Sequence, residues 1–185
     1  MTSSGFSFKE PSFFPMAKGY SNEGGKYTPI DYPSIQGGPA GELCSNAHDM
    51  AKFLQAMLSG SRIGFDTKSI SASSLKRMES SHTSLAAKKG LPGGYGLAIS
   101  NGWRHGYKSL GHNGGIDGFV SDYFYLPDAD FAVAVSVNTG RRTRTIVNAI
   151  LDYYLETPDV ERVVKPISDG TVSYTHLTLP TICSV

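Results

Sequence analysis

A glycine-rich segment in the second half of the chain carries residue types that could form part of a catalytic pocket. It reads Gly111-His112-Asn113-Gly114-Gly115. Glycines let the backbone approach a ligand closely and leave N–H groups free to donate hydrogen bonds. His112 adds a titratable ring and Asn113 a side-chain amide. The same residues suit a hairpin turn with an exposed histidine, so the segment alone leaves both a pocket and a turn open.

Two short patterns look like companions of this segment, and both are interpreted as coincidences. Ser73-Ser74-Leu75-Lys76 fits Ser-x-x-Lys, in which a lysine one helical turn away can take the proton of a serine hydroxyl. A catalytic lysine needs apolar neighbours, whereas this stretch is polar and suits a surface. Tyr20-Ser21-Asn22 fits Tyr-x-Asn but straddles the start of a predicted turn.

Composition excludes several classes of protein. The chain has 185 residues, enough for one domain, and its formal net charge of +1 does not favour nucleic acid as a partner. The two cysteines and five histidines show no metal-binding spacing, so no metal and no cofactor are predicted. No apolar run is long enough to span a membrane, and residues 1–5 do not resemble a signal peptide.

The sequence pattern predicts loops, a hairpin and two helices in the first half of the chain. Residues 1–16 are interpreted as a loop, 18–29 as a hairpin and 36–41 as a glycine-rich loop. A helix follows, capped by Ser45 or Asn46 and ended by Gly60. A second helix is predicted over 72–79, with Ser71 as its cap.

The second half predicts a meander of strands and a closing helix. Strands are expected over 95–100, 108–112, 118–126 and 130–138, with a turn at 127–130. The last strand alternates large residues with small ones, which indicates a close-packed layer on both of its faces. The closing helix is expected over 143–155, with this apolar stripe: Ile146, Val147, Ile150, Leu151 and Tyr154. The fold class is therefore α+β (or an α/β layer arrangement), an antiparallel sheet with packed helices.

Five blocks, in order, resemble the serine β-lactamase and penicillin-binding-protein-like hydrolases of the class C type. They are Pro39 to Leu58, Tyr95-Gly96-Leu97, Gly111 to Phe119, Leu126-Pro127-Asp128 and Val135 to Asn138. The resemblance implies that the chain is the C-terminal portion of the β-lactamase/transpeptidase-like fold. Residues 1–6 look like an internal point of that family, so Met1 is expected to be an internal methionine.

The resemblance also gives the glycine-rich segment a function. Three motifs assemble the family's active site: Ser-x-x-Lys, Tyr-x-Asn and Lys/His-x-Gly. His112-Asn113-Gly114 looks like the third of these, on an edge-facing strand beside the nucleophile. It implies His112 and Gly115 as catalytic residues, with the Gly115 N–H as one half of an oxyanion hole. Asn113 and Gly114 are implied to bind substrate. The serine is expected in sequence outside this chain, so the chain alone is expected to be inactive.

The expected domain covers residues 1–166, whereas 167–185 look like translated sequencing adapter rather than native protein. The implied parent reaction is acyl transfer through a serine ester, on a β-lactam, a D-amino-acid peptide or an ester. A non-catalytic ligand-binding module of the same fold is the alternative. Self-association through exposed surface is also expected, because an incomplete sheet exposes edges. The family is commonly exported, which implies an extracytoplasmic location.

Overall fold

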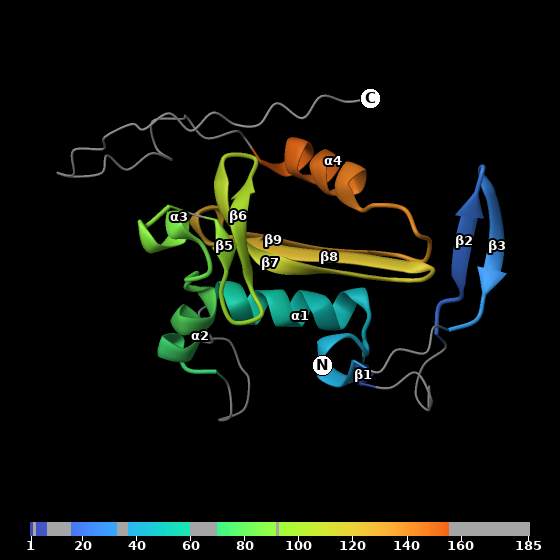
Figure 1. Ribbon diagram of the computed structural model, residues 1–185, viewed down its shortest axis with the longest axis horizontal. Helices are drawn as coiled ribbons and strands as arrows, with labels where there is room; N and C mark the ends of the chain where they lie inside the picture. The colour runs from blue at the N-terminus through green and yellow to red at the C-terminus, as the bar shows by residue number, and fades with distance from the viewer. Residues whose placement is uncertain (2, 7–15, 33–36, 60–69, 92, 156–185) are drawn as a thin grey trace.

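A five-stranded antiparallel sheet with a helix on each face organises the molecule (Figure 1). The computed structural model describes residues 1, 3–6, 16–32, 37–59, 70–91 and 93–155. The strands follow one another in the sheet in the order of the chain. They are β5 (Gly94–Tyr95), β6 (Ser100–Arg104), β7 (Tyr107–Ile116), β8 (Phe119–Leu126) and β9 (Phe131–Val137). The α+β class predicted from the sequence is confirmed.

Helix α1 (Ala47–Leu58) covers one face of the sheet. Asn46 is its N-cap, because its side chain accepts a hydrogen bond from the Asp49 N–H at 2.9 Å. Leu54 and Met57 are buried against Leu110 and Tyr125 of the sheet. The predicted cap and apolar spacing are confirmed, whereas Gly60 lies outside the described residues.

Asp49 ties the beginning of the chain to α1. Its Oδ2 accepts hydrogen bonds from the Ser3 N–H and the Ser4 hydroxyl, both at 2.8 Å. Burial by itself raises the pKa of Asp49, but these hydrogen bonds, together with the positive charges of the N-terminus and Lys52, outweigh it and hold the pKa below its ordinary value. Beside this anchor β1 (Gly5–Phe6) pairs with β4 (Leu43–Cys44), so the prediction of a loop is wrong for Gly5 and Phe6.

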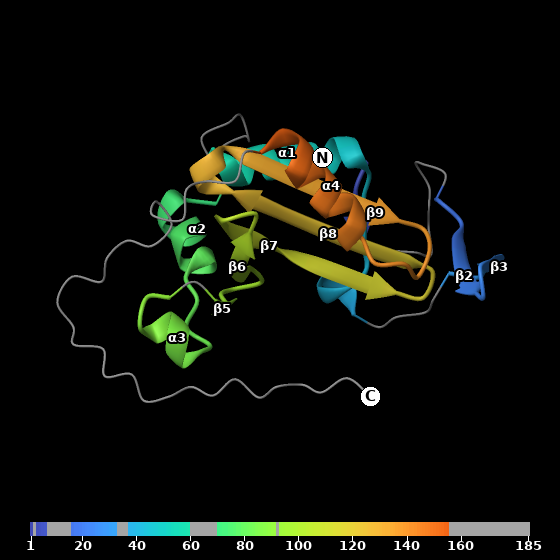
Figure 2. The same cartoon turned by 90° about the horizontal axis from the view of Figure 1, so that it is seen from above.

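Helix α4 (Arg144–Tyr154) covers the opposite face (Figure 2). Val147 and Leu151 are buried against Phe124, Leu126 and Val133. The small residues of β9, Ala132 and Ala134, pack on the α1 side instead, which confirms close packing on both faces. The predicted apolar stripe is only half right, because Ile146 and Tyr154 are exposed.

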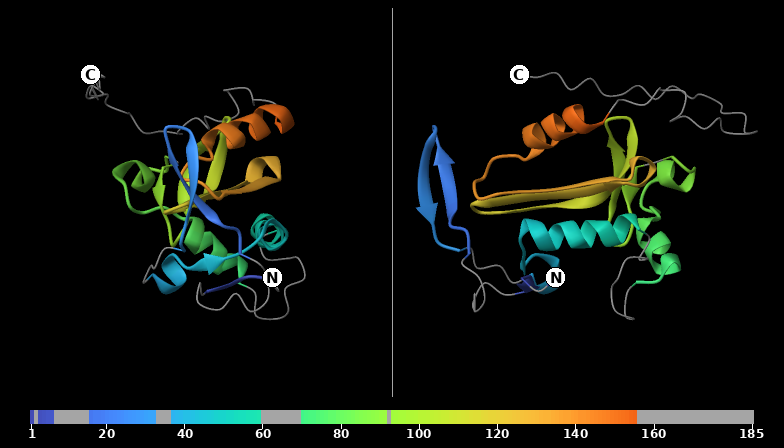
Figure 3. Two further views of the ribbon diagram at one scale, coloured as in Figure 1. Left: turned by 90° about the vertical axis from the view of Figure 1, so that its right-hand side faces the viewer. Right: turned by 180° about the vertical axis from the view of Figure 1, so that it is seen from behind.

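The remaining elements lie at the two ends of the sheet (Figure 3). Helices α2 (Ala72–Glu79) and α3 (Leu85–Lys88) lie beside β5; α2 and its Ser71 cap were predicted, and α3 was missed. At the other end is the predicted hairpin, β2 (Gly19–Glu23) with β3 (Lys26–Ile30). The Tyr20 N–H bonds the Asn138 carbonyl at 3.0 Å, and this contact attaches the hairpin to the sheet.

The strand predicted over 95–100 is wrong. Those residues form a tight reversal between β5 and β6, in which the Gly96 N–H bonds the Ile99 carbonyl at 2.7 Å. Ala98 adopts a φ of 58°, a conformation that glycine or asparagine adopts more readily, so the residue type at this position did not mark the reversal in the sequence. The turn at 127–130 is confirmed. The tail predicted for 167–185 lies outside the described residues.

Truncating a side chain between α1 and the sheet should be costly. Leu110 is 1% exposed, and we expect Leu110→Ala to lower the free energy of unfolding by about 2–5 kcal/mol because it leaves a cavity. Leu97 is 57% exposed, so Leu97→Ala should change it by less than about 0.5 kcal/mol. Urea unfolding followed by circular dichroism measures both, and equal losses would contradict this packing.

Candidate active site

The segment Gly111–Gly115 lies inside a strand, as the resemblance implied, whereas the strand predicted from the sequence pattern ended at His112. β7 runs on to Ile116 and pairs with β8 from Leu110↔Tyr125 to Ile116↔Phe119. On the other side β6 stops at Ser100↔Gly111. Among the described residues, the half of β7 from His112 to Ile116 therefore has a strand neighbour on one side only. We call this half the open half of β7.

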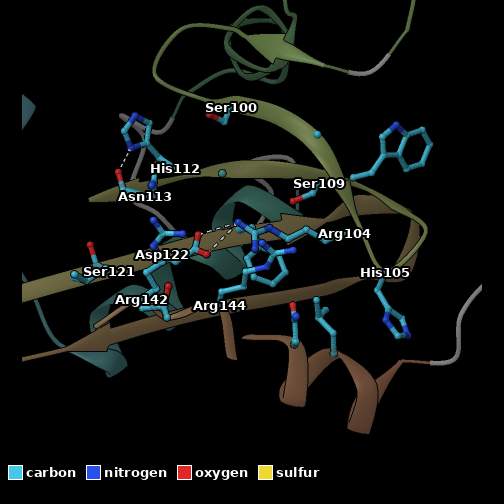
Figure 4. Close-up of a pocket in the computed structure, with 18 of the residues that line it drawn as sticks. Ser100, Arg104, His105, Ser109, His112, Asn113, Ser121, Asp122, Arg142 and Arg144 are labelled. Carbon is cyan, nitrogen blue, oxygen red and sulfur yellow. Dashed lines mark hydrogen bonds and ion pairs between the residues drawn. The ribbon is translucent and has the colours of Figure 1, made fainter. Parts of the chain in front are cut away.

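Because side chains alternate along a strand, His112 and Asn113 point to opposite faces. His112 lies opposite Tyr123, on the face that α1 covers, and Asn113 lies opposite Asp122, on the α4 face. Figure 4 shows the two side chains diverging from β7. The ring Nδ1 of His112 lies 2.5 Å from the Asn113 carbonyl oxygen. The structure brings the two predicted residues together through the backbone and not through their side chains.

Aromatic rings surround His112 on its own face. The Tyr95 ring stands edge-on to it, with centroids 5.6 Å apart and planes at 77°. Tyr123 is half-buried, and its pKa is raised first by burial and then by the neighbouring Tyr95. Phe53 of α1 packs edge-on against Tyr123 at 5.4 Å. These three residues form the aromatic wall of the candidate site.

Sequence reasoning did not assign Tyr95 to the site, because it placed Tyr95 at the start of a continuous strand. The reversal after β5 is what turns its ring toward His112. One available signal was Gly96, which follows it directly. A Cβ there would lie 2.0 Å from the Met78 carbonyl oxygen, so only glycine fits.

The glycines of the segment differ in whether a side chain would fit at their positions. At Gly111 a Cβ would meet the Tyr123 carbonyl oxygen at 2.1 Å, so the fold itself requires glycine. At Gly114 the nearest atom is the Ser121 hydroxyl at 3.0 Å, which can rotate away. A Cβ added at Gly115 would meet no atom within 4 Å outside its chain neighbours. The backbone around Gly115 is therefore open to a ligand.

The two coincidental patterns lie away from this site. Ser73 and Lys76 are exposed on α2, and the Ser73 hydroxyl lies 2.9 Å from that of Ser71. Tyr20 and Asn22 lie on β2, at the opposite end of the molecule from α2 (Figure 1). The Asn22 side chain accepts the Gly25 N–H at 3.1 Å and so stabilises the hairpin turn. The structure gives neither pattern a place beside His112.

Within the described part of the chain, no three His, Cys, Asp or Glu side chains gather as a metal site. None of the helices described is long and apolar enough to cross a membrane. A pocket of about 980 Å³ lies on the α4 face of the sheet and includes Asn113 in its lining.

Comparison with known proteins identifies the family of the chain. The Beta-lactamase family model matches residues 1–152, and the chain belongs to the beta-lactamase family. No curated protein sequence matches it.

Solved structures share the fold. The octameric penicillin-binding protein homologue from Pyrococcus abyssi is 24% identical with a TM-score of 0.64, over 81% of this chain and 33% of that one. A D-stereospecific amidohydrolase from Streptomyces sp. is 24% identical with a TM-score of 0.53, over 73% of this chain and 39% of that one. The structure of SurE is 19% identical with a TM-score of 0.57, over 84% and 36%. The chain thus spans little more than a third of these proteins.

Two glycines of the segment should respond differently to the same substitution. Gly111→Ala should lower the free energy of unfolding by about 1–3 kcal/mol or more, because the added methyl group overlaps a backbone oxygen of β8. Gly115→Ala should change it by less than about 0.5 kcal/mol, because the space is empty. Chemical denaturation of both variants tests this. A Gly115→Ala protein as unstable as Gly111→Ala would contradict the conclusion that the space beside Gly115 is empty.

Proposed function

We propose that this chain forms one wall of the active site of a serine hydrolase that works by acyl transfer. The observation that carries the proposal is the open half of β7, which presents His112 and Gly115 where β6 no longer covers the strand. An edge strand has backbone N–H groups that no neighbouring strand uses. Such a group can donate to the oxyanion that develops when a serine attacks a carbonyl.

Each predicted residue then has a function. The Gly115 N–H is one half of the oxyanion hole, and the N–H of the nucleophilic serine is the other. His112 binds substrate and sets the electrostatics of the pocket, with its ring orientation limited by the edge of Tyr95. Gly114 lets the substrate approach the strand, and Asn113 can reach it only across the edge of the sheet, because its side chain is on the other face.

The substrate class is an amide or ester bearing a carbonyl that serine can attack: a β-lactam, a D-amino-acid peptide or a simple ester. The names of two structural neighbours, a penicillin-binding protein homologue and a D-stereospecific amidohydrolase, favour an amide. The nucleophile belongs to the part of the fold that these longer proteins have in addition. The chain of 185 residues alone should turn over neither nitrocefin nor p-nitrophenyl acetate.

The test uses the complete reading frame around this sequence, expressed with the Ser-x-x-Lys motif that we expect before Met1. In that protein His112→Ala should lower kcat/KM by roughly 10²-fold, as expected for a positioned histidine in the pocket. His82→Ala is the matched control, since His82 is exposed outside the sheet, and it should leave kcat/KM unchanged.

Two results would contradict the proposal. One is an unchanged kcat/KM in His112→Ala. The other is turnover by the 185-residue chain that Ser73→Ala abolishes, because this would make Ser73 the nucleophile. Binding of a β-lactam without turnover by the complete protein would favour the non-catalytic module instead.

We also propose that the chain associates with itself. Among the described residues β9 pairs only with β8, and its sequence FAVAVSV has neither charge nor proline to block a further strand. Helix α4 adds exposed aromatic surface at Tyr153, which is 80% exposed, and Tyr154, which is 66% exposed. A second copy could cover both features.

Light scattering after gel filtration should therefore show oligomers that grow with concentration. Replacing Tyr153 and Tyr154 together by serine should shift the equilibrium toward monomer. Trp103→Ser removes an aromatic residue of β6 that is 45% exposed and should have no such effect. A wild-type chain that stays monomeric at all concentrations would exclude the association.

A further inference from the structure

The pocket of about 980 Å³ lies between the start of α4 and strands β6 to β8 (Figure 4). It lies mainly on the α4 face of the sheet, and Gly111, His112 and Asn113 of the candidate active site also contribute to its lining. Its lining includes three arginines, one from β6 and two from the beginning of α4: Arg104, Arg142 and Arg144. The sequence showed a basic run at 141–144 but gave no sign that Arg104 would lie beside it.

The charges in this pocket do not cancel. The Arg104 guanidinium holds both oxygens of Asp122, at 3.0 and 3.1 Å, so this pair is neutral. Asp152, two turns along α4, lies 3.5 Å from the His105 ring. Arg142 and Arg144 form no ion pair with any residue that the structure describes. An excess of positive charge therefore remains at the start of α4.

The backbone of α4 adds to this excess. The first N–H groups of a helix have no partner within the helix and carry partial positive charge. Thr143 is the N-cap but makes no capping hydrogen bond with its side chain, and the first turn has no acidic residue. Cations at this end of a helix are unfavourable, so α4 begins with a positive potential that nothing described here neutralises.

Two largely buried residues that carry hydroxyls point independently to a ligand. Ser109 of β7 and Thr143 are each only 6% exposed, and both line the pocket. Neither hydroxyl forms a hydrogen bond within the described part of the chain, and neither oxygen is among its fully enclosed unpartnered atoms, so both are accessible from the pocket. In Figure 4 the Ser109 side chain lies over the pocket on the same side as Arg104. A hydroxyl can donate to an oxyanion.

We propose that this pocket binds the phosphate group of a small phosphorylated molecule. Arg142 and Arg144 supply the charge, Ser109 and Thr143 donate from their hydroxyls, and the first turn of α4 contributes its partial positive charge. A phosphate offers three oxygens and close to two negative charges, which matches this donor set better than a carboxylate does. The pocket volume, at the upper end of the range for small-ligand sites, leaves room for an organic group beyond the phosphate.

The experiment titrates the full chain with inorganic phosphate at constant ionic strength, followed by calorimetry or amide chemical shifts. We expect saturable binding. Replacing Arg142 and Arg144 together by glutamine should raise the Kd by at least about tenfold, since two charge-assisted contacts are lost. The matched control is Arg141→Gln: Arg141 does not line the pocket, and its guanidinium lies 6.0 Å from the Tyr27 ring. The Arg141→Gln protein should bind phosphate with the Kd of the wild type.

Ser109→Ala provides a second variant that keeps every charge, and it should weaken phosphate binding severalfold if its hydroxyl donates to the anion. If the double arginine variant does not fold, Ser109→Ala still tests whether this pocket binds phosphate. Absence of saturable phosphate binding would overturn the proposal. An equal loss in Arg141→Gln, or acetate binding as tightly as phosphate, would also overturn it, because either result means that general positive charge and not this pocket attracts the anion.

Discussion

Burial of β8 from both sides is the constraint on which the rest of the molecule depends. Phe124 and Tyr125 are adjacent, point to opposite faces and are 1% and 0% exposed. Tyr125 packs with α1, and its hydroxyl donates to the Glu79 carboxylate of α2 at 2.8 Å. Phe124 packs with α4 and lies under the Arg104 guanidinium. One strand thus fixes the position of both helical layers and, through its pairing with β7, of the candidate site.

Much of this architecture could be predicted from the sequence, because the signals are local. The Asn46 and Ser71 caps, the apolar spacing of α1 and the Pro127 turn each predict an element that the structure contains. The reversal between β5 and β6 could not be predicted, because Ala98 takes a left-handed conformation that its residue type does not announce. The exposure of Ile146 and Tyr154 depends on tertiary packing, which periodicity does not describe.

The strand position of the predicted segment agrees with the sequence more closely than its geometry does. The motif placed His112 to Gly115 correctly beside the strand that becomes β8. The opposite orientations of His112 and Asn113 follow from strand alternation, but only once the segment is known to continue as β7. The contact between Tyr95 and His112 depends on a reversal that the sequence hides. Arg104 and the residues at the start of α4 likewise come to line one pocket only after folding.

The meander has a consequence for how the chain folds. Every strand from β5 to β9 pairs with its immediate neighbour in sequence, so each pairing closes only a short loop and loses little chain entropy. Contacts of this kind favour fast formation. By contrast, α1 must find the sheet across the residues between Leu58 and β5. The sheet and α4 are therefore expected to assemble early as a local unit, onto which α1 and the beginning of the chain dock.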